Sequence, residues 1–163
     1  MVELSPSHMR KKWQLLYKGS RDGFGAEDFH EKCDGIPNTF TLIQSTRGHI
    51  FGGFSSKAWQ SNGKFKSDNK AYIFSLVNKK NEPFRRQYHV CEHPSINCSS
   101  WLGPGFGRDI CIASNSNVNE ESFADFGHSY RHIGFTYGSE EAKSILAGVF
   151  HFKTLEIAVF SRI

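Results

Sequence analysis

Short β-prone runs, each ended by a polar or glycine-containing turn, follow one another along this sequence and restrict the folds open to it. There are seven or eight such runs, with only two or three short helical patterns between them. The sequence shows no β–α–β alternation and no internal repeat. The pattern therefore predicts a mainly β (α+β) domain, a sandwich of two antiparallel β-sheets flanked by a few short helices. The expected strands lie within residues 13–20, 39–45, 49–55, 71–78, 84–91, 108–114, 130–138 and 149–162.

The length and aromatic content of the chain fit one such domain. Its 163 residues can bury a core without disulfides or metals, and its 15 Phe residues favour an ordered, β-rich structure. We expect residues 1–12 to be an extension or the tail of a preceding region, and residues 13–163 to form the domain. The sequence has no secretory signal and no apolar stretch of about 18 residues that would cross a membrane. We therefore expect a cytoplasmic protein with reduced cysteines.

Three local patterns predict particular elements. Apolar residues at helical spacing within residues 25–35, followed by Gly35, predict a short helix. A short connection that ends in Gly48 joins residues 39–45 to residues 49–55, which predicts a β-hairpin. The pair Gly52-Gly53 inside the second of these strands indicates a bulge or a close approach of another part of the chain.

The C-terminal region contains one ambiguous segment and one change of phase. Residues 139–148 are ambiguous, and a helix capped by Ser139 and ended by Gly148 fits them. In the last run, residues 149–162, the alternation of apolar residues shifts by one position at Thr154. A shift of this kind predicts a β-bulge.

The glycine-rich stretch GPGFGRD, residues 103–109, resembles a phosphate-binding loop only superficially. No Lys-Ser/Thr pair follows its glycines, as a P-loop requires, and a strand-like run follows where a dinucleotide-binding motif needs a helix. We predict a structural turn in which Pro104 restricts one φ angle and the glycines permit positive φ. Asp109 is expected to accept hydrogen bonds from backbone N–H groups or to pair with Arg108.

The residues alone predict no catalytic site, metal or cofactor. Four residues of zinc-ligand type lie within ten positions but lack a second group of ligands elsewhere: His89, Cys91, His93 and Cys98. Ser129 lies close in sequence to His128, His132 and Asp125, without the motif of a nucleophile elbow. Glu156 lies inside the last run, so its carboxylate must face solvent or find a partner.

The order of these motifs resembles the TLDc domain family. The resemblance runs through LLYKGSRDGFGAEDFHEKCDG, TLIQSTRGHIFGGFSSKAW and AYIFSL, is most specific at GPGFGRDICI followed by GHSY, and closes with ILAGVFHFKTLEIAVF. It covers residues 13–161 and implies the same β-sandwich. A second acidic residue that the family often carries in its last strand corresponds to Ala158 here. The family-motif positions are Gly52, Gly53, Trp59, Gly103, Pro104, Phe106, Gly107, Asp109, Glu156 and Phe160.

The resemblance implies a non-catalytic interaction domain linked to oxidative-stress resistance, which binds and regulates the peripheral sector of the V-type proton ATPase. We accordingly expect a monomer with a protein partner, no nucleic acid and no membrane insertion. Phe24 and Phe106, two aromatic residues in glycine-rich turns, are the candidate interaction anchors. The alternative is a direct antioxidant that consumes peroxide through a cysteine, and Cys91 and Cys98 are then the candidate redox residues.

Overall fold

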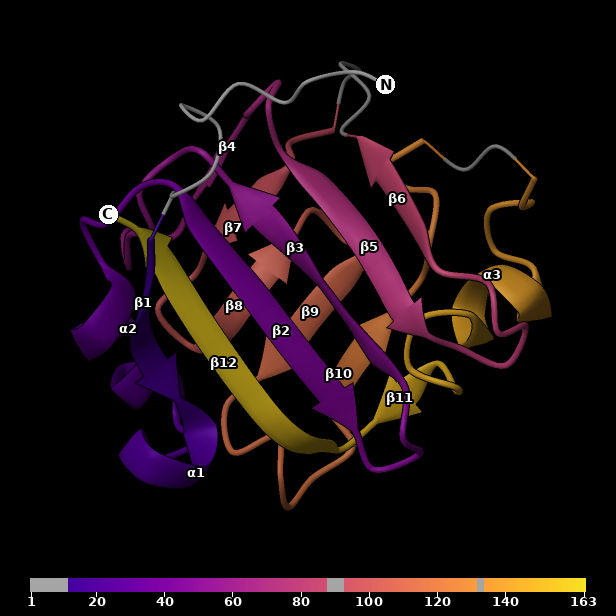
Figure 1. Cartoon of the computed structure of the whole chain (residues 1–163), viewed down its shortest axis with the longest axis horizontal. Helices are drawn as coiled ribbons and strands as arrows, with labels where there is room; N and C mark the ends of the chain where they lie inside the picture. The colour runs from indigo at the N-terminus through magenta and orange to yellow at the C-terminus, as the bar shows by residue number, and fades with distance from the viewer. Residues whose placement is uncertain (1–11, 88–92, 132–133) are drawn as a thin grey trace, which may run out of the picture.

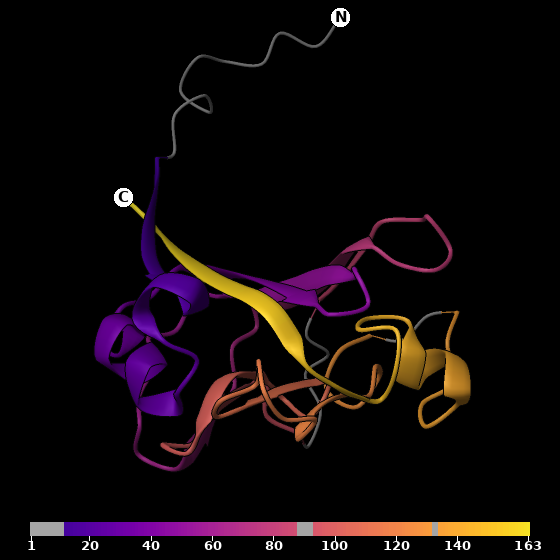
Figure 2. The same ribbon diagram turned by 90° about the horizontal axis from the view of Figure 1, so that it is seen from below.

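The computed structural model describes residues 12–87, 93–131 and 134–163, and two stacked antiparallel sheets confirm the predicted sandwich (Figure 1 and Figure 2). The first sheet contains, in spatial order, β1 (Trp13–Lys18), β12 (Thr154–Arg162), β2 (Thr39–Ser45), β3 (Ile50–Ser55), β5 (Tyr72–Val77) and β6 (Phe84–Gln87). The second sheet contains, in spatial order, β11 (His151–Phe152), β10 (Ser122–Ala124), β9 (Ile110–Ala113), β8 (Leu102–Phe106), β7 (Ile96–Cys98) and β4 (Lys64–Lys66).

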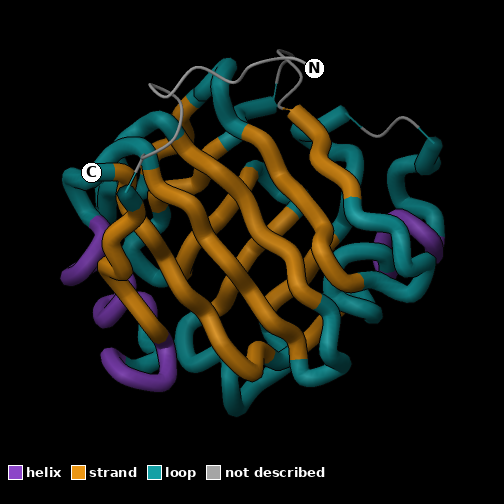
Figure 3. Tube along the Cα trace, in the orientation of Figure 1, coloured by secondary structure: helices purple, strands orange, loops and turns teal. Residues whose placement is uncertain are grey.

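Short helices lie at the two ends of the sandwich (Figure 3). Helices α1 (Gly19–Asp22) and α2 (Ala26–Cys33) lie beside β1, and α2 confirms the helix predicted within residues 25–35. Helix α3 (Glu140–Ser144) lies at the other end, and the Ser139 hydroxyl caps it by accepting from the Ala142 amide at 3.1 Å. None of these described helices covers the outer face of the first sheet, which is turned toward the viewer in Figure 1. None is long and apolar enough to cross a membrane.

The predicted hairpin and the predicted phase change are both present. Strands β2 and β3 pair antiparallel, and Gly48 in their connection has a φ angle of 82°. The register between β12 and β2 shifts between Thr154 and Glu156, as the change of phase at Thr154 predicts. The structure adds a feature that the sequence does not show, because β11 pairs with β10 in the second sheet whereas β12 belongs to the first. The chain therefore passes from one sheet to the other at Lys153.

One predicted turn and one predicted strand differ from the structure. The glycine-rich stretch is not a turn from residue 103 onward, because β8 continues as a strand through Phe106 and the turn begins only at Gly107. Pairing with β7 and β9 holds residues 102–106 extended despite their glycine and proline content. The described part of the strand predicted over residues 130–138 is not a strand, since residues 131 and 134–138 are loops and turns and residue 130 forms only an isolated bridge.

Candidate interaction surface

Strand β2 places its large apolar side chains on the outer face of the first sheet. Phe40 and Leu42 remain partly exposed there, while the positions that face the core are Thr39, Thr41, Ile43 and Ser45. Trp59 Nε1 donates a hydrogen bond to Thr39 Oγ1 at 2.8 Å, and Ser45 Oγ donates to the Ala147 carbonyl at 2.9 Å. These partners offset the cost of burying the Thr39 and Ser45 hydroxyls, whereas the buried Thr41 hydroxyl has no hydrogen-bond partner among the described residues. The strand thus presents its more apolar face away from the core.

Aromatic side chains from neighbouring strands continue this outer surface. The register places Phe40 opposite Phe160 on one side and opposite Phe54 on the other, and Phe54 opposite Tyr72. The Phe40 and Phe74 rings stack with centroids 4.7 Å apart, and Phe54 stacks on Tyr72 at 5.2 Å. We call this surface the aromatic face; it consists of Trp13, Leu15, Phe40, Leu42, Phe54, Tyr72, Phe74, Leu76 and Phe160.

Gly52 makes the stacking on the aromatic face possible. It lies between Leu42 and Phe74 in the register of the sheet. A Cβ atom at this position would lie 3.0 Å from Phe74 Cζ and would collide with the Thr41 carbonyl oxygen. The close approach predicted for the glycine pair is therefore present, and the missing side chain lets the Phe74 ring reach Phe40.

Gly53 faces the opposite way and makes room for Phe106 in the core. A Cβ atom at Gly53 would lie 2.5 Å from Phe106 Cε1. The Phe106 ring also meets Trp59 edge to face, with centroids 5.6 Å apart, and both side chains are fully buried. The candidate anchor Phe106 must therefore be corrected, because a ring with no exposed surface cannot contact a partner. Its motif position is explained by packing between the sheets.

Asp109 organises the loop after β10. Its carboxylate accepts hydrogen bonds from the backbone N–H groups of Gly127, His128 and Ser129 at 2.9, 2.8 and 2.6 Å. Burial raises the pKa of Asp109 to about 7, and the N–H donors of the same loop act in the opposite direction. The predicted acceptor role of Asp109 is present in the structure. The alternative, an ion pair with Arg108, does not occur, because Arg108 makes no ion pair with any described residue.

The remaining motif positions have local roles. Gly103 and Pro104 are buried in β8. Glu156, on the outer side of β12, accepts from the Ser20 amide at 3.0 Å and the Ser20 hydroxyl at 2.5 Å, and so joins α1 to the sheet. Gly107 adopts a φ angle of 59° and packs against Ser129.

The candidate anchor Phe24 is half-buried against the core, and its role as an anchor stays a prediction.

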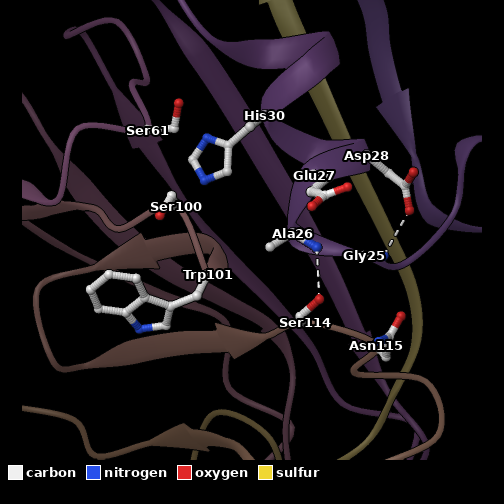
Figure 4. Close-up of a pocket in the computed structure, with 10 residues that line it drawn as sticks. All are labelled: Gly25, Ala26, Glu27, Asp28, His30, Ser61, Ser100, Trp101, Ser114 and Asn115. Carbon is white, nitrogen blue, oxygen red and sulfur yellow. Dashed lines mark hydrogen bonds between the residues drawn. The ribbon is translucent and has the colours of Figure 1, made fainter.

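A cleft of about 800 Å³ lies between α2 and the turns before β8 and after β9 (Figure 4). Its one imidazole, His30, is held by Asp34 at 2.7 Å and by the carbonyls of Ser99 and Leu102 at 3.0 Å. Asp28 accepts the Gly25 amide, and Ser114 Oγ accepts the Ala26 amide. These groups hold the helix in place and are not arranged as a nucleophile and base. Among the described residues, no three His, Cys, Asp or Glu side chains are grouped as metal ligands.

Three of the four cysteines are buried thiols. Cys33, Cys98 and Cys111 are all buried, and burial raises the pKa of each, that of Cys111 to about 12. A peroxide-reactive cysteine needs an accessible thiolate, so the position of Cys98 argues against its redox role. Cys91, the other redox candidate, lies outside the described residues.

We expect Cys33, Cys98 and Cys111 to react with a thiol reagent only after denaturation, because water and reagent do not reach them in the folded state. The measurement is a thiol titration at about pH 8 with and without denaturant, in the chain carrying Cys91→Ser. Fast labelling of a thiol in the folded variant would contradict this expectation and would favour the antioxidant alternative.

The family model for the TLDc domain matches residues 1–161. The chain belongs to the TLDc domain family. Its relatives include the MTOR-associated protein MEAK7 of Gallus gallus, 34% identical over 74 residues, and of Mus musculus, 30% identical over 77 residues. The matches cover 44% and 45% of this chain but only 15% and 16% of those relatives, so this TLDc chain corresponds to a small part of each.

Proposed function

We propose that this TLDc domain is a non-catalytic protein-interaction module whose aromatic face docks on a subunit of the peripheral sector of the V-type proton ATPase. The aromatic face, which none of the described helices covers, is the observation that supports a docking role. Trp13 and Leu76 are 45% and 47% exposed, and large apolar surfaces of this kind on soluble domains mark interaction sites. Aromatic residues near the centre of an interface supply most of its binding energy.

The choice of partner rests on the family and not on the face itself. The TLDc family resemblance implies the peripheral ATPase sector, a link to oxidative-stress resistance and a cytoplasmic location. The name of the MEAK7 relatives describes an association with MTOR, which also supports an interaction role for proteins that contain this region. Arg85, whose guanidinium lies 4.2 Å from the Tyr72 ring centroid, adds a charged group at the edge of the aromatic face.

The test is binding of the purified chain to the purified peripheral ATPase sector at micromolar concentration, by co-sedimentation. We expect the wild type to bind and Phe54→Ser to raise the Kd by about tenfold or more, since Phe54 lies in the middle of the aromatic face. Trp13→Ser, at the edge of the face, is expected to have a smaller effect in the same direction.

The matched control is Val118→Ser, because Val118 is 68% exposed in the β9–β10 connection, away from the aromatic face. Its Kd should equal that of the wild type. Absence of wild-type binding at micromolar concentration would rule out the proposed partner. Equal binding by Phe54→Ser and Val118→Ser, with both variants folded, would rule out the aromatic face as the docking surface.

A further inference from the structure

A smaller pocket, of about 260 Å³, opens beside the turn between β8 and β9. The segment before β7 and the loop after β10 meet this turn, so residues distant in sequence are brought together. The pocket is lined by Phe65, His93, Pro94, Gly107, Arg108, His128 and Ser129. It is separate from both the aromatic face and the cleft beside α2.

Among the described residues that line the pocket there are nitrogen donors and no carboxylate. The rings of His93 and His128 lie with centroids 4.1 Å apart, and Arg108 is exposed beside them. None of the lining residues is Asp or Glu. Asp109, which follows Arg108 in the sequence, has both carboxylate oxygens occupied by backbone N–H groups of the loop, and Glu92, which precedes His93, lies outside the described residues. A guanidinium and two imidazoles therefore face one small space, which favours an anion.

We propose that this pocket binds a phosphate monoester carried on an aromatic ring, with the phosphate against Arg108, His93 and His128 and the ring against Phe65. A guanidinium suits a phosphate because its parallel N–H groups match two phosphate oxygens. Phe65 is 54% exposed on the edge strand β4 and offers an aromatic surface at the pocket. The side chain of phosphotyrosine has this chemistry.

The surroundings of His128 couple binding to protonation. Burial lowers the pKa of His128, the charges of His93 and Arg108 lower it further, and Asp125 raises it. Of the other groups that face this ring, Ser129 Oγ lies 3.2 Å from Nδ1 and the Tyr137 ring centroid lies at 5.7 Å. A phosphate placed beside the ring would favour the protonated imidazole, so binding takes up a proton. The affinity is expected to rise as the pH falls from about 8 to about 6.5.

The experiment is a titration of the whole chain with phenyl phosphate, followed by amide chemical shifts in NMR spectra. We expect a Kd of about 1 mM, the range for a ligand of this size, with shifts at Arg108 and at residues 127–129. Arg108→Gln is expected to weaken binding about tenfold, because a charge-assisted hydrogen bond is lost. The control is Arg47→Gln, an exposed arginine in the β2–β3 connection that does not line the pocket, and it should bind like the wild type.

Two further comparisons separate this proposal from general attraction of anions. Inorganic phosphate should bind more weakly than phenyl phosphate to the wild type, and Phe65→Ala should remove that difference. His128→Gln should flatten the pH dependence of the Kd, an effect that a purely structural role would not produce. Equal affinity for the two ligands in the wild type would overturn the aromatic part of the proposal. Binding that is unaffected by Arg108→Gln, or no saturable shifts around the pocket, would overturn the site itself.

Discussion

Asp109→Ala is expected to lower the free energy of unfolding by about 4 kcal/mol, because several backbone N–H groups lose their only charged acceptor. The amides of Gly127, His128 and Ser129 all donate to this carboxylate, and the Asp109 side chain is fully buried. No water replaces a buried acceptor at low cost, so each unsatisfied donor adds a penalty of about 1–3 kcal/mol. The loss should appear as a lower midpoint in denaturant unfolding with an unchanged slope.

The measurement is made at about pH 8, above the pKa of about 7 to which burial raises Asp109, so that the carboxylate is ionised. Because a raised pKa means that ionisation disfavours the folded state, the loss caused by Asp109→Ala should be larger at about pH 5 than at about pH 8. Glu120→Ala is the control, since it removes a carboxylate from an exposed loop position and should change stability by less than about 0.5 kcal/mol. A similar small loss for Asp109→Ala would show that the loop after β10 does not depend on this acceptor.

Elements defined by local signals were predictable from the sequence. Helix α2 and the β2–β3 hairpin depend on residues close together in the chain, namely a helical spacing ended by Gly35 and a turn containing Gly48. These features need little information from distant parts of the chain. For Asp109 the sequence left two roles open, acceptor of backbone N–H groups or partner of Arg108, and the structure shows the first.

Features that depend on distant partners were not predictable. Phe106 lies in a glycine-rich stretch and was expected at the surface, yet it is buried because Gly53, in the other sheet, leaves space for its ring. The partial exposure of Phe40 and Leu42 is unexpected, because both side chains are hydrophobic. Its only signal in the sequence is the alternation of Thr39, Thr41 and Ser45 with these apolar residues, which leaves open which face is buried. The Thr39 and Ser45 hydroxyls find partners on the core side, in Trp59 Nε1 and the Ala147 carbonyl, which favours burial of this face.

The gathering of His93, Arg108 and His128 was likewise beyond sequence reasoning. In the sequence they belong to three separate motifs: His93 to the group of zinc-ligand type, Arg108 to the glycine-rich stretch and His128 to the group around Ser129. Strand β8 pairs with both β7 and β9, and this pairing brings the ends of their connections to one side of the sheet. A pocket whose residues are brought together by strand pairing cannot be recognised from the spacing of those residues in the sequence.

Gly53→Ala is expected to destabilise the domain by about 3 kcal/mol, although alanine is otherwise acceptable in a strand. The added methyl group would lie 2.5 Å from Phe106 Cε1, and the ring cannot move away because Trp59 packs against it. Gly103→Ala is a close control, since its Cβ would lie 3.4 Å from Ile112 Cγ2 in ordinary contact. Its cost should stay below about 1 kcal/mol, as measured by thermal and denaturant unfolding.

The cause of the Gly53→Ala effect can be isolated by combining it with Phe106→Leu. The smaller side chain removes the ring atoms that would clash, so the double variant should lose less stability than the sum of the two single variants. We expect a coupling of at least about 1 kcal/mol, as for residues in direct contact. Additive losses would mean that Gly53 is required for the conformation of β3 itself. A favourable coupling would mean that this motif glycine is required because a ring from the opposite sheet occupies the place of its side chain.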